Sequence, residues 1–154
     1  MSTRAIQFLK QQNIPFEIIQ YEHAEKGADF AARATGFPLE QTVKTLVVDC
    51  GEKRHALVLM PGGKQLSMKQ LAKALGVKRA VMADTGTAER LTGYLTGGIS
   101  PFGTKQKLSA IMEVRILDYD KILINAGQRG TMLLMSPQDI RVALRCSVAP
   151  IAQA

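Results

Sequence analysis

The sequence lacks the segments that would place a chain in a membrane or outside the cell. No apolar run approaches the roughly 20 residues that a membrane-spanning helix needs. The N-terminal stretch MSTRAIQFLKQQNIPF has no continuous apolar core of the kind found in signal peptides. We therefore expect a cytoplasmic protein without membrane contact.

Cysteine and histidine are scarce, with two residues of each. Cys50 and Cys146 are too few for a disulfide framework, and no Cys/His spacing indicates a metal site. The hydrolase motifs GxSxG and HExxH are missing, and no pair of carboxylates stands out. His23 and His55 are interpreted as structural or surface residues. The sequence predicts no metal, no other cofactor and no conventional hydrolytic triad.

What is present is an ordinary globular composition with a strong positive charge. The 154 residues are 46% hydrophobic and 21% charged, and no linker, repeat or low-complexity tract divides them. We therefore expect a single domain over residues 1–154, long enough to bury a core. The net charge of +7 suits either a solvated surface or a polyanionic partner such as nucleic acid. Positive residues concentrate at Lys69, Lys73, Lys78, Arg79, Lys105 and Lys107.

Helical and extended patterns are interspersed along the chain without strict alternation. Helical patterns cover residues 3–13, 27–36, 67–76, 87–93 and 136–145. Strand patterns cover residues 14–23, 42–50, 55–62, 109–118, 121–125 and 131–135. The turn residues GEKR at 51–54 predict a hairpin between the two strands that flank them. This order favours an α+β fold with a mixed β-sheet, curled and flanked by helices.

Lys44 is the residue in these patterns that is best suited to chemistry. Side chains alternate along a strand, so Lys44 shares a face with Leu46 and Val48, whereas Thr45 lies on the other face. A lysine among apolar neighbours either extends its ammonium to solvent or points into a pocket. In a pocket it would bind an anion or stabilise charge that develops on a carbonyl oxygen.

The segment LTGYLTGGISPFG, residues 91–103, contains four glycines and one proline and no charged side chain. Gly97 and Pro101 have the spacing GxxxP. Glycine lets the backbone approach a ligand closely, and Pro101 restricts both its own backbone and that of Ser100. The segment is therefore either a structural tight turn or a stiff loop that directs backbone groups at a small ligand.

Four segments occur together in an order and spacing that resemble the YbaK/ProX family. They are TVKTLVV, KQLSMKQLAKALG, MADTGTAERLTGYLTGGISPFGTKQKL and NAGQRG. The family consists mostly of freestanding aminoacyl-tRNA deacylases related to the editing insertion domain of bacterial prolyl-tRNA synthetase. The resemblance covers residues 1–145 and implies a mixed sheet curled into a barrel-like core with surrounding helices.

The resemblance implies hydrolysis of the ester bond of a mischarged aminoacyl-tRNA, with Cys-tRNA(Pro) ranked first and Ala-tRNA(Pro) second. The family's key lysine maps onto Lys44, which would be catalytic and hold the ester carbonyl or the terminal phosphate. The GxxxP loop would hold the aminoacyl group through its backbone. No protein nucleophile is needed, because the ester is already activated. The implied substrate-binding residues are Tyr21, Thr45, Gly97, Gly98, Ile99, Ser100, Pro101 and Gly127.

The turn AGQRG, residues 126–130, matches a glycine-rich turn that faces the pocket in the family, with two departures. Ala126 replaces the first glycine, and Met132 stands where the Cys-editing branch has an aspartate. An apolar wall at Met132 would favour a small aliphatic group such as alanyl. The alternatives are therefore another small aminoacyl-tRNA, another small ester or amide, or a non-catalytic tRNA-binding module. The expected partner is aminoacyl-tRNA, with prolyl-tRNA synthetase as a candidate and no DNA.

Overall fold

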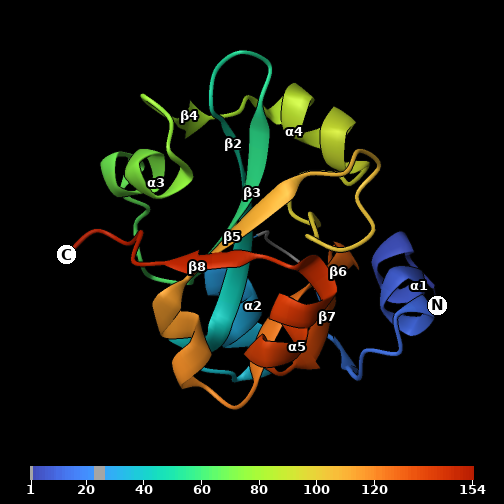
Figure 1. Cartoon of the computed structure of the whole chain (residues 1–154). Helices are drawn as coiled ribbons and strands as arrows, with labels where there is room; N and C mark the ends of the chain where they lie inside the picture. The colour runs from blue at the N-terminus through green and yellow to red at the C-terminus, as the bar shows by residue number, and fades with distance from the viewer. Residues whose placement is uncertain (1, 23–26) are drawn as a thin grey trace.

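A twisted mixed sheet forms the centre of the fold (Figure 1). The computed structural model describes residues 2–22 and 27–154. In this part of the chain the strand order is β1-β7-β6-β2-β3-β5-β8, and β4 pairs with β2 outside this path. The strands are β1 (Glu17–Gln20), β2 (Thr42–Asp49), β3 (His55–Pro61), β4 (Val81–Met82), β5 (Ser109–Glu113), β6 (Ile122–Gln128), β7 (Thr131–Met135) and β8 (Ser147–Ala149).

Parallel and antiparallel pairs are mixed in this sheet, as predicted. β2 pairs antiparallel with β3 and parallel with β6, while β5 lies parallel to both β3 and β8. The strand direction rotates strongly across the sheet, from nearly upright β2 and β3 to nearly horizontal β8 in Figure 1. Such a rotation is expected, because the twist between adjacent strands adds up across a sheet of several strands. The predicted α+β class is confirmed.

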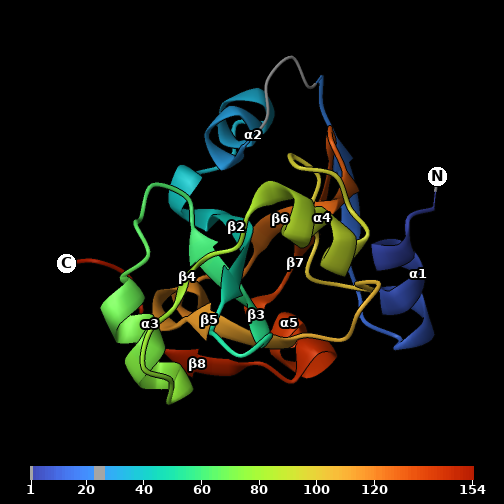
Figure 2. The same ribbon diagram turned by 90° about the horizontal axis from the view of Figure 1, so that it is seen from above.

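The helices surround the sheet (Figure 2). They are α1 (Arg4–Gln11), α2 (Ala28–Thr35), α3 (Met68–Leu75), α4 (Thr85–Thr92) and α5 (Pro137–Leu144), with short 3-10 helices η1 (Leu39–Gln41) and η2 (Val114–Asp118). Their ends follow the sequence signals: the hydroxyl of Ser67 accepts a hydrogen bond from the backbone N–H of Gln70, and Ser136 caps α5 in the same way. None of the described helices is long and apolar enough to cross a membrane.

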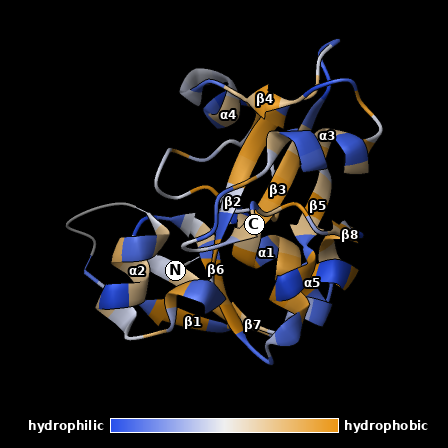
Figure 3. Cartoon of the chain, turned by 90° about the vertical axis from the view of Figure 1, so that its left-hand side faces the viewer, coloured by the Kyte–Doolittle hydropathy of each residue, from blue (hydrophilic) through white to orange (hydrophobic). Residues whose placement is uncertain are grey.

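The two faces of β2 and β3 contribute to different parts of the core. Val43 and Val47 pack in the larger cluster with residues of α1, α4 and α5, whereas Val48 packs with Leu71 of α3. β3 is therefore buried on both faces, which explains its continuous apolar sequence (Figure 3). A smaller cluster joins Ala31 of α2 to the β6–β7 pair.

Some expectations about single elements were wrong. The strand expected over residues 109–118 ends at Glu113, because the Glu113 carboxyl accepts the N–H of Arg115 and starts η2. His55 begins β3, at the start of the strand predicted over residues 55–62, and is half-buried. The short strands β4 and β8 were not predicted. His23 lies outside the described residues. Cys50 and Cys146 are free thiols.

Candidate active site

A pocket opens where one edge of β2 lacks a neighbouring strand. On this edge β6 pairs only with Thr42 and Val43, and β4 pairs only with Val48 and Asp49. Among the described residues, the intervening stretch 44–47 has no strand partner on that side. A cavity of about 270 Å³ lies over it. It is lined by Tyr21, Gly27, Ala28, Ala31, Val43, Lys44, Thr45, Leu46, Val47, Met82, Ala83, Thr85, Ala88, Thr96, Gly97, Ile99, Asn125 and Met132.

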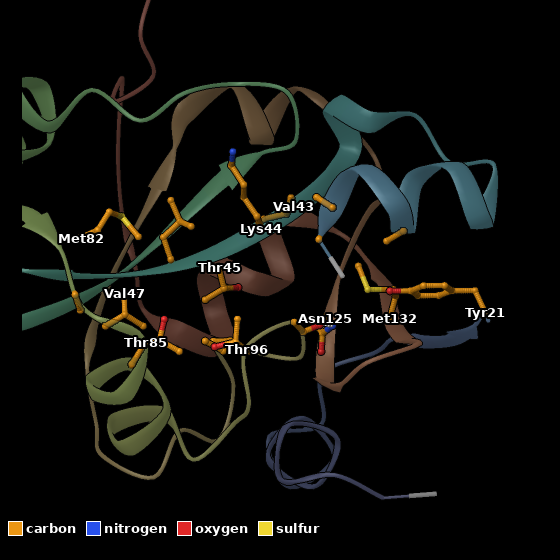
Figure 4. Close-up of a pocket in the computed structure, with 18 residues that line it drawn as sticks. Tyr21, Val43, Lys44, Thr45, Val47, Met82, Thr85, Thr96, Asn125 and Met132 are labelled. Carbon is orange, nitrogen blue, oxygen red and sulfur yellow. Dashed lines mark hydrogen bonds between the residues drawn. The ribbon is translucent and has the colours of Figure 1, made fainter. Parts of the chain in front are cut away.

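Lys44 lies at the rim of this pocket. Its stem forms part of the wall, and its Nζ donates a hydrogen bond of 2.9 Å to the backbone carbonyl of Lys64 in the loop after β3. Figure 4 shows the ammonium on the opposite side of β2 from Thr45, as the predicted alternation requires. The charge is therefore exposed at the pocket entrance, and the chamber beneath β2 contains no ammonium group from Lys44.

Thr45 projects into the chamber and faces Thr96 and Asn125 (Figure 4). Its hydroxyl oxygen is buried and has no hydrogen-bond partner among the described residues. Buried hydroxyls are nearly always hydrogen-bonded, so an unpartnered one that lines a pocket is a ready contact for a polar ligand. The hydroxyl can both donate and accept.

The glycine-rich loop is folded tightly against the core. Tyr94 is buried, and its hydroxyl donates to the carbonyl of Phe102, which closes the loop between these residues. Burial raises the pKa of Tyr94 to about 12, against smaller lowering effects of Arg4 and a backbone hydrogen bond. The absence of charge in this segment thus has a structural cause, since Ser100 and Phe102 are fully buried.

Only part of the GxxxP loop reaches the pocket wall. Gly97 and Ile99 line the cavity, and Thr96 beside them is held by hydrogen bonds of 2.7 Å and 3.0 Å from its N–H and hydroxyl to Glu89. Gly98, Ser100 and Pro101 are buried outside the lining residues. These residues lie on the side of the loop that faces away from the cavity.

The second glycine-rich turn, residues 126–130, packs against the first loop. A Cβ on Gly98 would lie 3.0–3.1 Å from backbone atoms of Gln128 and Arg129. Gly127 has a positive φ of 99°, and a Cβ there would lie 2.6 Å from the ring of Tyr94. Gly127 is not among the residues that line the cavity. Both glycines therefore allow the two turns to approach each other.

Asn125 connects the two turns and also lines the pocket. Its Oδ1 accepts hydrogen bonds from the N–H groups of Gly127 (2.7 Å) and Gln128 (3.0 Å). Its Nδ2 donates to the carbonyl of Gly97 at 3.4 Å. The Arg129 side chain adds hydrogen bonds of 3.1 Å and 3.3 Å to the carbonyl of Thr96. The two loops therefore form one unit.

Tyr21 and Met132 form the apolar end of the pocket (Figure 4). Met132 is 3% exposed and packs with Ala31 and Leu123, and Tyr21 packs against this cluster. Burial raises the pKa of Tyr21, and a hydrogen bond with the backbone of Gly130 opposes the shift. No carboxylate, cysteine or histidine is among the lining residues that the structure describes.

A known family matches most of this sequence. The sequence profile of the aminoacyl-tRNA editing domain matches residues 23–143. The chain belongs to this family. EbsC of Enterococcus faecalis, provisionally named a Cys-tRNA(Pro)/Cys-tRNA(Cys) deacylase, is 29% identical over 140 residues, which cover 90% of this chain and 85% of EbsC. ProXp-y of Escherichia coli, a multifunctional Ser/Thr-tRNA deacylase, is 28% identical over 145 residues, which cover 91% of this chain and 86% of ProXp-y.

A solved structure shares the fold of this editing domain. A crystal structure described provisionally as a trans-editing enzyme for prolyl tRNA synthetase superposes with a TM-score of 0.90 at 23% identity, covering 100% of this chain and 99% of that one. The family and the fold that the sequence motifs predicted are confirmed.

Three polar residues of the editing-domain pocket were not predicted from the sequence. They are Thr85, Thr96 and Asn125, which line the cavity together with Thr45. For Asn125 a signal existed: an asparagine directly before a glycine often accepts hydrogen bonds from the backbone of the following turn. For Thr96 the pattern gave none, because its position depends on the contact between α4 and the loop that follows it.

Proposed function

We propose that this editing domain hydrolyses the ester bond of a mischarged aminoacyl-tRNA. The observation that supports this most strongly is the pocket itself. It is small, bordered by the first glycine-rich loop, and lined by apolar side chains together with a few hydroxyl and amide groups and one lysine at its rim. The size suits an aminoacyl group, and the exposed ammonium suits the phosphate of the terminal nucleotide. A cytosolic location belongs to this proposal.

Lys44 binds the terminal phosphate in this proposal, in preference to the ester carbonyl. Its ammonium lies on the opposite side of β2 from Thr45, Thr96 and Asn125, which surround the chamber. An aminoacyl group inside the chamber would place its ester near these polar groups. The nucleotide would then extend over the rim towards Lys44.

The reaction needs positioning more than a protein nucleophile. A water oxygen forms a bond to the ester carbonyl carbon while the bond to the tRNA oxygen breaks, and a proton from the water passes to the departing ribose oxygen. If a ribose hydroxyl or the thiol of a cysteinyl ester attacks first, the acyl group moves to that oxygen or sulfur, and water then cleaves the new ester or thioester. Thr45 and Asn125 have the hydrogen-bonding groups to orient the ester, and preorganised contacts of this kind accelerate acyl transfer.

The ranking of substrates remains Cys-tRNA(Pro) first and Ala-tRNA(Pro) second. The end of the pocket at Tyr21, Ala31 and Met132 is apolar, and a thiol or a methyl group is compatible with a methionine wall. A cysteinyl group also brings its own nucleophile. The names of EbsC and ProXp-y refer to cysteinyl and to seryl or threonyl substrates respectively, so both classes belong in the test.

Single-turnover hydrolysis of Cys-, Ala-, Ser- and Thr-tRNA(Pro) tests the function. We expect cysteinyl ester to be cleaved fastest, and Lys44→Ala to lower kcat/KM about 10- to 100-fold through loss of the phosphate contact while the fold is retained. Lys121→Ala removes an exposed lysine that is not in the pocket wall and should keep the wild-type rate.

Near-wild-type turnover by Lys44→Ala would exclude the proposed role of this lysine. Binding of tRNA without hydrolysis of any ester would instead identify a non-catalytic binding module. Faster alanyl than cysteinyl cleavage would reverse the substrate ranking.

A further inference from the structure

The backbone carbonyl of Lys64 accepts the hydrogen bond from Lys44. It belongs to a loop that pairs with the C-terminal segment of the chain. The backbone N–H of Gln153 donates to the carbonyl of Gln65 at 2.7 Å, and the N–H of Ser67 donates to the carbonyl of Ile151 at 2.8 Å. Between them, Leu66 and Ala152 form an antiparallel bridge. The C-terminal segment 151–153 thus pairs with residues 65–67, directly after Lys64.

Glu113 fixes this C-terminal segment from the inside of the molecule. One carboxyl oxygen accepts the N–H groups of Ile151 (2.9 Å) and Ala152 (3.0 Å), and the other accepts the N–H of Arg115 (2.8 Å). Glu113 is 1% exposed and Ile151 is fully buried. A buried carboxyl group with three backbone donors is costly to move, because each donor would lose its partner.

We propose that the C-terminal segment 151–153, anchored by Glu113, is a positioning element for the ammonium of Lys44. It holds residues 65–67, so the carbonyl of Lys64 stays in place and directs the Lys44 side chain to the pocket rim. This inference rests on the proposed role of Lys44 in phosphate binding. The segment follows the last residue, 143, of the range that matches the editing-domain family.

The arrangement has a clear physical advantage. A lysine side chain has four flexible bonds and loses much rotamer freedom when its ammonium is fixed. The hydrogen bond to Lys64 lies at the surface, where a single bond gives little stabilisation in competition with water. A rigid acceptor limits the positions of the ammonium before substrate arrives, and preorganisation of this kind favours catalysis.

Gln153 offers a matched pair of variants. Gln153→Pro removes the N–H that binds Gln65 and also the side chain, whereas Gln153→Ala keeps this N–H and loses only the side chain with its 3.4 Å hydrogen bond to Leu66. The residue is exposed, so neither variant creates a cavity. Thermal unfolding should remain close to wild type in both.

The first readout is the NMR signal of the Lys44 side-chain Cε, assigned by its loss in Lys44→Arg. We expect Gln153→Pro to shift or broaden this signal and Gln153→Ala to leave it unchanged. The second readout is kcat/KM for the best substrate. Gln153→Pro should lower it about three- to ten-fold, the typical effect of one hydrogen bond.

A double-mutant cycle separates positioning from general damage. If the segment acts through Lys44, Gln153→Pro causes no further loss in the Lys44→Ala background. An equal loss in both backgrounds, or an unchanged Lys44 signal in Gln153→Pro, would overturn the proposal. Should Lys44→Ala keep wild-type turnover, the proposed role of Lys44 fails. The NMR comparison then still shows whether the segment fixes the ammonium.

Discussion

Substitution of Gly98 by alanine tests whether the contact between the two glycine-rich turns is needed for activity. The new Cβ would lie 3.0 Å from the backbone N of Arg129 and 3.1 Å from two backbone carbons of Gln128. Comfortable contacts between such atoms begin near 3.5 Å, so the turns must separate by about 0.4 Å. Because both partners are backbone, no flexible side chain can move aside.

A separation of this size would alter the pocket because Asn125, which lines it, is hydrogen-bonded to both turns. Its bond to the carbonyl of Gly97 is already 3.4 Å long, and about 0.4 Å more would exceed hydrogen-bonding distance. Overpacking of this kind costs about 1–3 kcal/mol of stability. Displacement of groups that orient a substrate reduces rates strongly, so we expect kcat/KM to fall about 10- to 100-fold.

Single-turnover deacylation, with thermal unfolding as the measure of stability, provides the assay. Gly86→Ala is the control, since its Cβ would lie 3.6 Å from the Asp84 side chain, an ordinary contact, in the exposed first turn of α4. This variant should keep the wild-type rate and gain up to about 1 kcal/mol. A Gly98→Ala enzyme with unchanged kcat/KM would refute the idea that the two turns must remain in contact.

Three further predictions concern pH, specificity and salt. Because the pKa of Tyr94 rises from 10.0 to about 12 on folding, the native state holds its proton longer. The unfolding free energy should therefore fall by about 2 kcal/mol as pH rises from 10 to 12, and Tyr94→Phe should remove this fall in alkaline denaturation curves. Met132→Asp should raise the ratio of cysteinyl to alanyl cleavage, and an unchanged ratio would show that position 132 does not set specificity. Affinity for tRNA should decrease steeply with salt in filter-binding assays, because phosphate contacts release counterions, and a flat salt dependence would make the +7 charge incidental.

Local signals in the sequence were sufficient for most elements of the fold. The β2–β3 hairpin follows from two apolar runs around GEKR, and the helix starts at Ser67 and Ser136 follow from capping chemistry. Strand alternation correctly separated Lys44 from Thr45. These features depend on neighbours within a few residues, which is the range that sequence patterns report.

Features that depend on contacts between distant residues could not be predicted from local sequence patterns. The hydrogen bond from Asn125 to Gly97 joins residues 28 positions apart, and that from Lys44 to Lys64 joins residues 20 apart. Glu113 also accepts hydrogen bonds from backbone groups 38 and 39 residues later, which no pattern near position 113 indicates. No local pattern indicates which backbone group a polar side chain will find after folding.

The pocket walls divide into two parts with different chemistry, which bears on how an editing domain selects its substrate. The turns around Gly97 and Gly127 pack closely and tolerate few substitutions, since an added Cβ would lie 3.0–3.1 Å from backbone atoms at Gly98 and 2.6 Å from the Tyr94 ring at Gly127. The opposite end, at Tyr21 and Met132, is built from side chains whose size and polarity can change without disturbing those turns. Substrate choice is therefore expected to vary at the Tyr21–Met132 end while the positioning groups stay fixed.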